Sequence, residues 1–226
     1  MADPDLTGLR VTLTGSAEPS LLEATKGTFT TAGAGVTVAP GFDATVGSPD
    51  VVVVFARRPS DDAILATDDA AFAAGLEAQL HAPLRAAVAA GRVLAGGSGG
   101  VVLLVGSVDL YHAYPGRSIA SVAMGGLLGL TRSMAIELAG SGVRTDLVVA
   151  GPLGDEGGGA PPEADRASLD RTLLRAPSHR LARPSEVAAA IRFVAGPDAA
   201  FMTGQTLRVD GGWSSLNQAP DGMRFP

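Results

Sequence analysis

The stretch "DVVVVFA", residues 50–56, places six apolar residues in a row after an aspartate. A strand with one face in water alternates apolar and polar residues, whereas a strand covered on both faces is apolar throughout. Strands of the second kind occur in parallel sheets, whose crossover connections place helices on both faces. Residues 50–56 therefore predict a central strand of a parallel sheet.

Segments on either side of this strand alternate between strand-like and helix-like patterns. This alternation predicts a single α/β domain with a Rossmann-like, doubly wound parallel sheet over residues 1–216, followed by a tail at 217–226. Pro83 is expected to kink a helix, and the Gly- and Pro-rich segment 154–165 is expected to be a lid or a linker. The other expected strands are 9–15, 34–40, 100–107, 143–151 and 204–212, and the expected helices are 20–32, 68–91, 117–139 and 183–196.

The composition excludes several classes of function. The chain has 226 residues, 46% hydrophobic and 18% charged, as in a globular domain. A net charge of −6 argues against a nucleic-acid partner. No uninterrupted apolar run approaches the ~20 residues of a membrane span, and the N-terminus lacks the regions of a secretion signal. A cytoplasmic location away from membranes is expected. With no cysteine, and with His81, His112 and His179 scattered, no metal site is expected.

Three longer segments carry a family resemblance. The segments are "VVLLVGSV" (101–108), "GGLLGLTRSMAIELAGSGVR" (125–144) and "RLARPSEVAAAIRFVAGPDAAFMTGQTLRVDGGWS" (180–214). Together they resemble the short-chain dehydrogenase/reductase family over nearly the whole chain. The resemblance implies a Rossmann fold, an NAD(P) cofactor, and a catalytic set of asparagine, serine, tyrosine and lysine.

The residues at the matching catalytic positions differ from that set. Ser107 corresponds to the family serine, but Ala120 stands thirteen residues later in place of the tyrosine, and Met124 four further in place of the lysine. Gln79 stands where the resemblance places the asparagine. Alanine cannot transfer a proton, and methionine carries no charge to lower the pKa of a neighbouring group. Intrinsic hydride transfer is therefore not expected.

The cofactor turn departs from the family pattern as well. The family reads T-G-x-x-x-G-x-G, and this chain reads "TGSAEPSL" from residue 14, so that Gly15 remains while Pro19 and Leu21 replace the later glycines. Residues 41–50 are too few for the strand and helix that the family places there, since one crossover takes at least ~10–12 residues. We expect a sheet shortened by about one strand-helix unit after the second strand. We also expect no cofactor on this chain, with NAD(P) held by a partner subunit.

Two functions are compatible with these losses. The leading hypothesis is a non-catalytic subunit that pairs with an active homologous dehydrogenase, or with itself, through helices 68–91 and 117–139 and the C-terminal segment. The alternative is a cofactor-independent cyclase, dehydratase or isomerase that uses residues 107–117, with His112 and Tyr114 as acid/base candidates. A protein that only binds a ligand is a third possibility. The sequence names neither substrate nor pathway.

Overall fold

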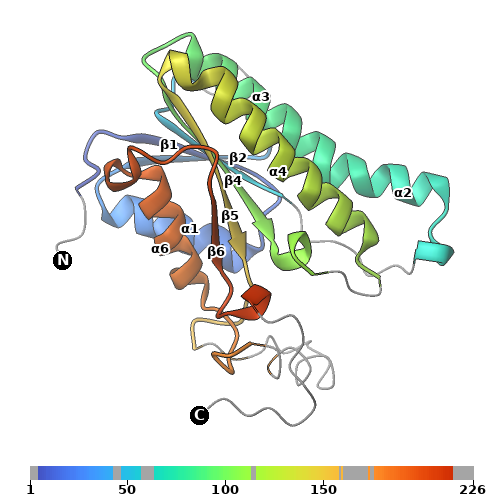
Figure 1. Ribbon diagram of the computed structural model, residues 1–226. Helices are drawn as coiled ribbons and strands as arrows, with labels where there is room; N and C mark the ends of the chain where they lie inside the picture. Colours follow the sequence, from blue (N-terminus) through green and yellow to red (C-terminus); the bar gives the residue numbers. More distant parts are fainter. Residues whose placement is uncertain are drawn as a thin grey trace.

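A computed structural model describes residues 5–42, 47–56, 64–112, 116–157, 159, 173 and 176–215. Its centre is a six-stranded parallel sheet in the order β2-β1-β3-β4-β5-β6 (Figure 1). Every pair of neighbouring strands runs in parallel. The strands are β1 Arg10–Gly15, β2 Gly35–Ala39, β3 Val51–Phe55, β4 Gly100–Ser107, β5 Val143–Ala150 and β6 Thr206–Val209. The predicted fold class and all six predicted strands are confirmed.

Helices cover both faces of this sheet. Figure 1 shows α1 and α6 together on one face, and α2, α3 and α4 on the other. Turns of 3-10 helix lie at Ile64–Ala66 (η1), Val108–Leu110 (η3), Ala139–Ser141 (η4), Pro197–Ala199 (η5) and Trp213–Ser215 (η6). The longer helical elements are α1 Pro19–Thr31, α2 Asp69–Leu76, η2 Glu77–His81, α3 Ala82–Ala95, α4 Ser118–Leu138 and α6 Pro184–Ala195.

The order of the strands shows where the sheet is short. The standard dinucleotide-binding order is 3-2-1-4-5-6. Removing its third strand and renumbering gives 2-1-3-4-5, which is the order of the first five strands of this chain; β6 adds a further strand beside β5, and β2 lies at the opposite edge. Between Ala39 and Val51 the described residues contain neither helix nor strand. The expected loss of one strand-helix unit is therefore confirmed, and it leaves the outer side of β2 without a neighbouring strand among the described residues.

Alternation along β3 explains why the quoted segment is apolar throughout. Val51, Val53 and Phe55 pack into the core under α1 and α6, and Val52 and Val54 pack into the core under α3 and α4. All five residues are at most 2% exposed. Because one strand supplies both cores, every position must be apolar.

Pro83 changes the helix in a way that the sequence analysis did not anticipate. The predicted helix 68–91 runs from Asp69 to Ala95 and contains a π-helical turn at Glu77–His81. A proline ring clashes with the carbonyl four residues before it, here that of Gln79. In the π turn the Ala82 N–H donates to the carbonyl of Glu77, five residues earlier, and not to the carbonyl four residues earlier as in an α-helix. The helix thus passes the proline by widening one turn.

Helix α4 has two chemical faces. Residues 118–141 are long and apolar enough by composition to cross a membrane, which the count of uninterrupted apolar residues missed. In the fold, Ala120, Ala123, Met124 and Leu127 of α4 are buried against the sheet. Length and composition alone do not distinguish a membrane span from a helix that covers a sheet.

Candidate functional site

The candidate site lies at the carboxyl ends of the strands, where open α/β sheets bind their ligands. Strand β4 ends at Ser107, and the 3-10 turn η3 follows at once. The Ser107 hydroxyl donates to Asp109 Oδ2 at 2.5 Å, and Asp109 is only 7% exposed. The one residue that matches the expected catalytic set is therefore held by a buried carboxylate two residues away.

The positions expected to hold tyrosine and lysine lie inside the hydrophobic core. Ala120 is 0% exposed and Met124 is 2% exposed. The backbone N–H of Ser107 donates to Met124 Sδ at 3.3 Å. A Cβ added at Gly106 would lie 2.7 Å from the same sulfur, so the thioether packs directly against β4. The thioether therefore fills the space between α4 and the end of β4.

Gln79 lies in the π-helical turn that packs against α4. Its side chain is 3% exposed, and its Oε1 has no hydrogen-bond partner in the described part of the chain. π turns within α-helices are frequent at functional sites. Here the π turn is explained by Pro83. The Gln79 side chain places a polar oxygen atom on the buried side of this turn, which packs against α4.

The chain forms a turn where the family binds its cofactor. The residues of this turn, however, make contacts within the fold. Gly15 has φ of +90°, and a Cβ there would overlap the carbonyl oxygen of Phe55. The glycine is thus required for the contact between β1 and β3. Pro19 is the first residue of α1, and Leu21 is buried at 4% exposure in the core under α1 and α6. Glu18 occupies the N-cap, where phosphate groups bind in dinucleotide folds.

The segment after β4 contacts the segment after β6. His112 Nε2 lies 3.1 Å from the carbonyl oxygen of Trp213. Because a carbonyl only accepts, this contact requires the proton of neutral His112 to be on Nε2. The guanidinium carbon of Arg208 lies 5.2 Å from the centre of the Tyr111 ring, a cation–π contact. Tyr114, the other acid/base candidate, lies outside the described residues.

A short turn completes this end of the sheet. The Asp210 carboxylate accepts the N–H groups of Gly212 at 3.0 Å and Ser214 at 2.9 Å, and Trp213 between them is 5% exposed. The contacts of Arg208 and Trp213 were not predicted from the sequence. The only signal for them was the parallel sheet itself, which brings the carboxyl ends of all strands to one edge.

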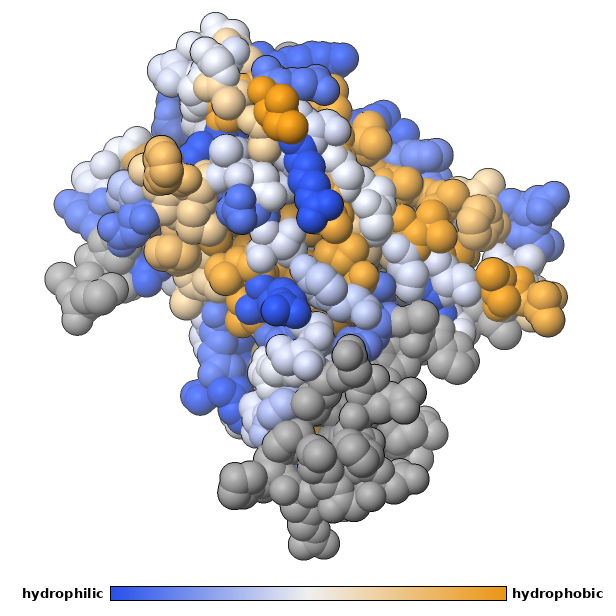
Figure 2. Space-filling view, viewed as in Figure 1, coloured by the Kyte–Doolittle hydropathy of each residue, from blue (hydrophilic) through white to orange (hydrophobic). Residues whose placement is uncertain are grey.

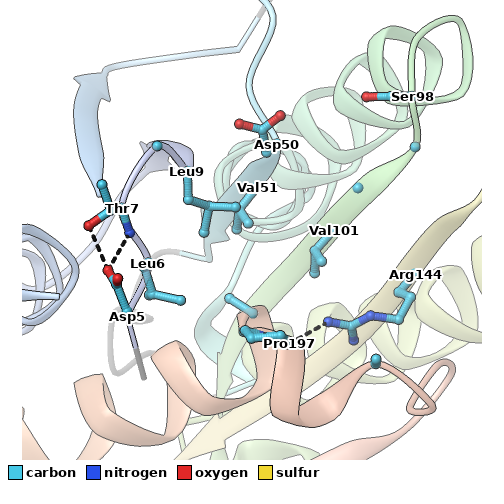
Figure 3. Close-up of a pocket in the computed structure, with 16 residues that line it drawn as sticks. Asp5, Leu6, Thr7, Leu9, Asp50, Val51, Ser98, Val101, Arg144 and Pro197 are labelled. Atoms are coloured by element: carbon cyan, nitrogen blue, oxygen red, sulfur yellow. Dashed lines mark hydrogen bonds between the residues drawn. The ribbon is translucent and has the colours of Figure 1, made fainter. Parts of the chain in front are cut away.

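A cavity lies at the opposite, amino-terminal edge of the sheet. It measures about 580 Å³, and Leu6, Leu9, Val51 and Val101 are among its lining residues (Figure 3). The partly buried Arg144, which also lines it, donates to Asp146 and to the carbonyls of Met202, Val194 and Gly196. These bonds hold loops together, and the cavity is remote from Ser107.

Segment 154–165 is described only at its start. The carboxylate of Glu156 accepts both the N–H of Ser185 at 3.1 Å and its hydroxyl at 2.6 Å, so the segment is attached to the first turn of α6. The rest of the segment lies outside the described residues, and the choice between lid and linker stays a prediction. Within the described ranges, no group of three or more His, Asp or Glu residues could hold a metal ion.

The sequence of this chain is similar to a known family and to several known proteins. Residues 33–214 match the family described as Enoyl-(Acyl carrier protein) reductase. The chain is 31% identical over 166 residues to a 3-oxoacyl-acyl-carrier-protein reductase of Vibrio cholerae, covering 74% of this chain and 67% of that one. It is 35% identical over 120 residues to an uncharacterised short-chain type dehydrogenase/reductase of Sinorhizobium fredii, covering 53% of this chain.

The structural similarity extends further along the chain. A protein of Sinorhizobium meliloti 1021, provisionally assigned as a short-chain alcohol dehydrogenase, superposes with a TM-score of 0.80 at 21% identity. The superposition covers 93% of this chain and 98% of that one, and it shows a shared fold. Among the curated relatives the coverage is smaller, since the match spans 22% of the Sinorhizobium fredii protein.

Proposed function

The chain belongs to the short-chain dehydrogenase/reductase family, and from that premise we propose that it is a non-catalytic subunit that pairs with an active homologous dehydrogenase. The observation that carries the proposal is the pair Ala120 and Met124, which are buried in α4 where the resemblance expects tyrosine and lysine. The relatives of this chain include reductases, and its six strands form one parallel sheet although one strand-helix unit is missing.

Proton transfer is the first function that these residues cannot supply. Reduction of a carbonyl group requires a proton donor beside the oxygen atom, within hydrogen-bond reach. Neither Ala120 nor Met124 has a titratable group, and both are closed off from solvent. Ser107, which remains, already donates its hydroxyl proton to Asp109.

The residues at the phosphate turn also do not fit a dinucleotide. Leu21 is fixed in the core, and Pro19 has no N–H to offer a phosphate. The carboxylate of Glu18 adds negative charge at the helix terminus that should receive the pyrophosphate. These features support the proposal that NAD(P) binds to a partner subunit and not to this chain.

The exposed side of the α2, α3 and α4 layer supplies a surface for such a partner. Figure 2 shows hydrophobic residues along the side of the molecule formed by α4 and α2. On α4, Val122 is 51% exposed and Ile136 is 82% exposed, and Phe72 on α2 is 36% exposed. Apolar side chains gathered on one face favour association. A homologous subunit would present equivalent helices. A heterodimer of the two chains would therefore keep the approximate two-fold symmetry of a homodimer contact.

A cofactor-independent enzyme remains the second candidate, because of one contact. The bond of His112 Nε2 to the Trp213 carbonyl makes Nδ1 the basic nitrogen of the neutral ring, and the exposed Tyr111 precedes His112 in the sequence. A base and a phenol at the carboxyl edge are compatible with isomerase or dehydratase chemistry. This candidate predicts turnover without nicotinamide that His112→Ala abolishes.

Native mass spectrometry of the tagged protein from its own host tests the proposal. A hetero-oligomer with a second family member, whose tyrosine and lysine are intact, is the expected result. A homo-oligomer alone would contradict the accessory-subunit role. In parallel, NADH and NADPH are titrated against the fluorescence of Trp213, the single tryptophan. No saturable change is expected, and the active partner serves as the positive control.

A further inference from the structure

The outer edge of β2 is the edge beside which the missing strand-helix unit would lie. Among the described residues β2 pairs with β1 only. In the standard order the third strand lies beside the second, so this is the edge at which that strand would add its hydrogen bonds. The backbone groups on that edge require another partner or water.

The register identifies which groups face outward. Gly35 N–H donates to the Leu9 carbonyl at 2.9 Å, so Gly35 faces β1. Both polar groups of a strand residue point to the same side, and the side alternates along the strand. Thr37 and Ala39 therefore face β1 as well, while Val36 and Val38 direct their N–H and C=O groups away from the sheet.

The edge lacks the features that usually prevent pairing. Protected edges carry lysine, an inward charge, a bulge or a proline. Residues 32–42 contain no charged residue, in a chain that is 18% charged. Strand β2 itself has no proline, and Pro40 comes only after its end. Val38 is 46% exposed, and three β-branched residues in a row favour an extended conformation.

We propose that β2 pairs with β2 of a second copy of this chain, antiparallel and about a two-fold axis through Thr37. The second strand takes the position that the missing third strand would occupy. Two six-stranded sheets then form one continuous sheet. This contact is separate from the helix surface described above and does not rest on the proposed function.

A two-fold axis through Thr37 matches every outward group. It places Val36 of one copy opposite Val38 of the other, and the reverse. Because these two residues hold the outward N–H and C=O groups, each pair exchanges two hydrogen bonds, which makes four in total. An axis through Val38 would put Val36 opposite Pro40, which has no N–H. An axis through Val36 would put Val38 opposite Ala34, whose N–H already donates to the Phe29 carbonyl.

The side chains also suit this register. Thr37 faces its own copy across a non-bonded pair, where the two Cα atoms are about 4.5 Å apart. Thr37 is exposed, so its hydroxyl can meet its counterpart. Neither β2 strand carries a charge, since residues 32–42 contain no charged residue. The pairing is short, and we expect a weak dimer that forms with increasing concentration.

Cysteine cross-linking tests the register directly, because the chain contains no cysteine. Thr37→Cys places two thiols within the ~4.4–6.8 Å Cα separation that a disulfide spans. Gly35→Cys is the matched control, on the same face and also exposed. In the proposed register its two copies are four residues out of step, about 14 Å apart. Under mild oxidation, Thr37→Cys is expected to form a disulfide-linked dimer and Gly35→Cys only background.

A second variant separates pairing from chance collision and from misfolding. Val38→Pro removes an outward N–H and blocks the edge, and prolines are tolerated where the N–H faces away from the sheet. Added to Thr37→Cys, it is expected to lower the cross-linked fraction to that of Gly35→Cys while circular dichroism stays unchanged. Equal cross-linking at positions 35 and 37, none at 37, or full cross-linking despite Val38→Pro would each overturn the proposal. The last two outcomes would favour a strand from another protein or a helix-mediated contact.

Discussion

Met124 shows most directly what a single residue does at the candidate site. Its sulfur accepts the Ser107 N–H and packs against β4 in a closed, apolar setting. Met124→Lys, which restores the family residue, puts an ammonium group into this closed, apolar setting. We expect a loss of about 3 kcal/mol or more in the free energy of unfolding, measured by urea denaturation.

The matched substitution at this position is Met124→Leu. Leucine preserves the volume and loses only the sulfur acceptor, so a loss below about 1.5 kcal/mol is expected. If the lysine variant were as stable as the leucine variant and also bound NADH, the site would be open and the non-catalytic proposal would fail.

Gly15 gives a second test at the residue scale. Gly15→Ala meets both a positive φ and the Phe55 carbonyl, and a destabilisation of at least about 2 kcal/mol is expected. Gly27→Ala is the control, because Gly27 lies within α1 with open space around it. That change is expected to raise the unfolding temperature slightly, since alanine favours a helix by about 0.5–1 kcal/mol. Equal effects of the two changes would mean that the β1–β3 contact does not require a glycine.

The identities of the site residues could be predicted from spacing, but their contacts could not. Ser107 falls at a strand end, and Ala120 and Met124 fall one helical turn apart, which the sequence pattern already indicates. The bond from Ser107 to Met124 depends on how closely α4 approaches β4. The contact of His112 with Trp213 joins residues 101 positions apart, and no local pattern encodes it.

At the scale of elements, α6 owes part of its stability to the charged groups at its start. Glu186 accepts two bonds from Arg180 at 2.7 Å and one from the Arg183 N–H at 2.9 Å. These bonds lower the pKa of Glu186 from 4.5 to about 2, and the hydrogen bonds from the Arg180 guanidinium make the largest contribution. The folded state thus favours the ionised carboxylate.

The pH dependence follows from this sign. The stabilisation by Glu186 is fully present above about pH 4.5 and is lost as the pH falls through about 2. Glu186→Gln should lower stability by about 1 kcal/mol at pH 7, a value reduced for solvent screening of this partly exposed pair. In thermal melts the difference from the parent protein should shrink toward pH 2. A difference that stays constant from pH 7 to pH 2 would show that the charge is not responsible.

The elements were largely predictable, and the exception has a clear cause. Strand and helix positions follow from apolar runs and periodicity, and each described boundary lies within a few residues of its prediction. The π turn at Glu77–His81 could not be read from the pattern. It differs from an α-helix by one residue per turn, and Pro83 signals a disturbance without specifying how the helix absorbs it.

At the scale of the whole molecule, the apolar face of α4 should govern association with other subunits. Ile136→Glu places a charge on a side chain that is 82% exposed, so the isolated chain should keep its stability within about 0.5 kcal/mol. Binding to a partner across this face should weaken about tenfold or more, measured by analytical ultracentrifugation.

Phe201→Glu is the companion variant for the C-terminal segment, since Phe201 is also fully exposed. If Phe201→Glu abolished association and Ile136→Glu did not, the partner would bind to the C-terminal segment and not to the helices. Whole-molecule features of this kind follow from sequence only in part. The short length of residues 41–50 predicts that one strand-helix unit is missing. The sequence does not indicate which partner pairs with the edge of β2 at that position.

The packing of α1 against α6 also affects how the protein is made. These two helices share one core, in which Leu21 and Phe29 meet Val187 and Ile191. Helix α1 ends at Thr31 and α6 begins only at Pro184, so the apolar side of α1 is synthesised long before the helix that covers it. Folding of this half is consequently a late event, and nascent chains truncated before residue 184 are expected to require chaperones to stay unaggregated.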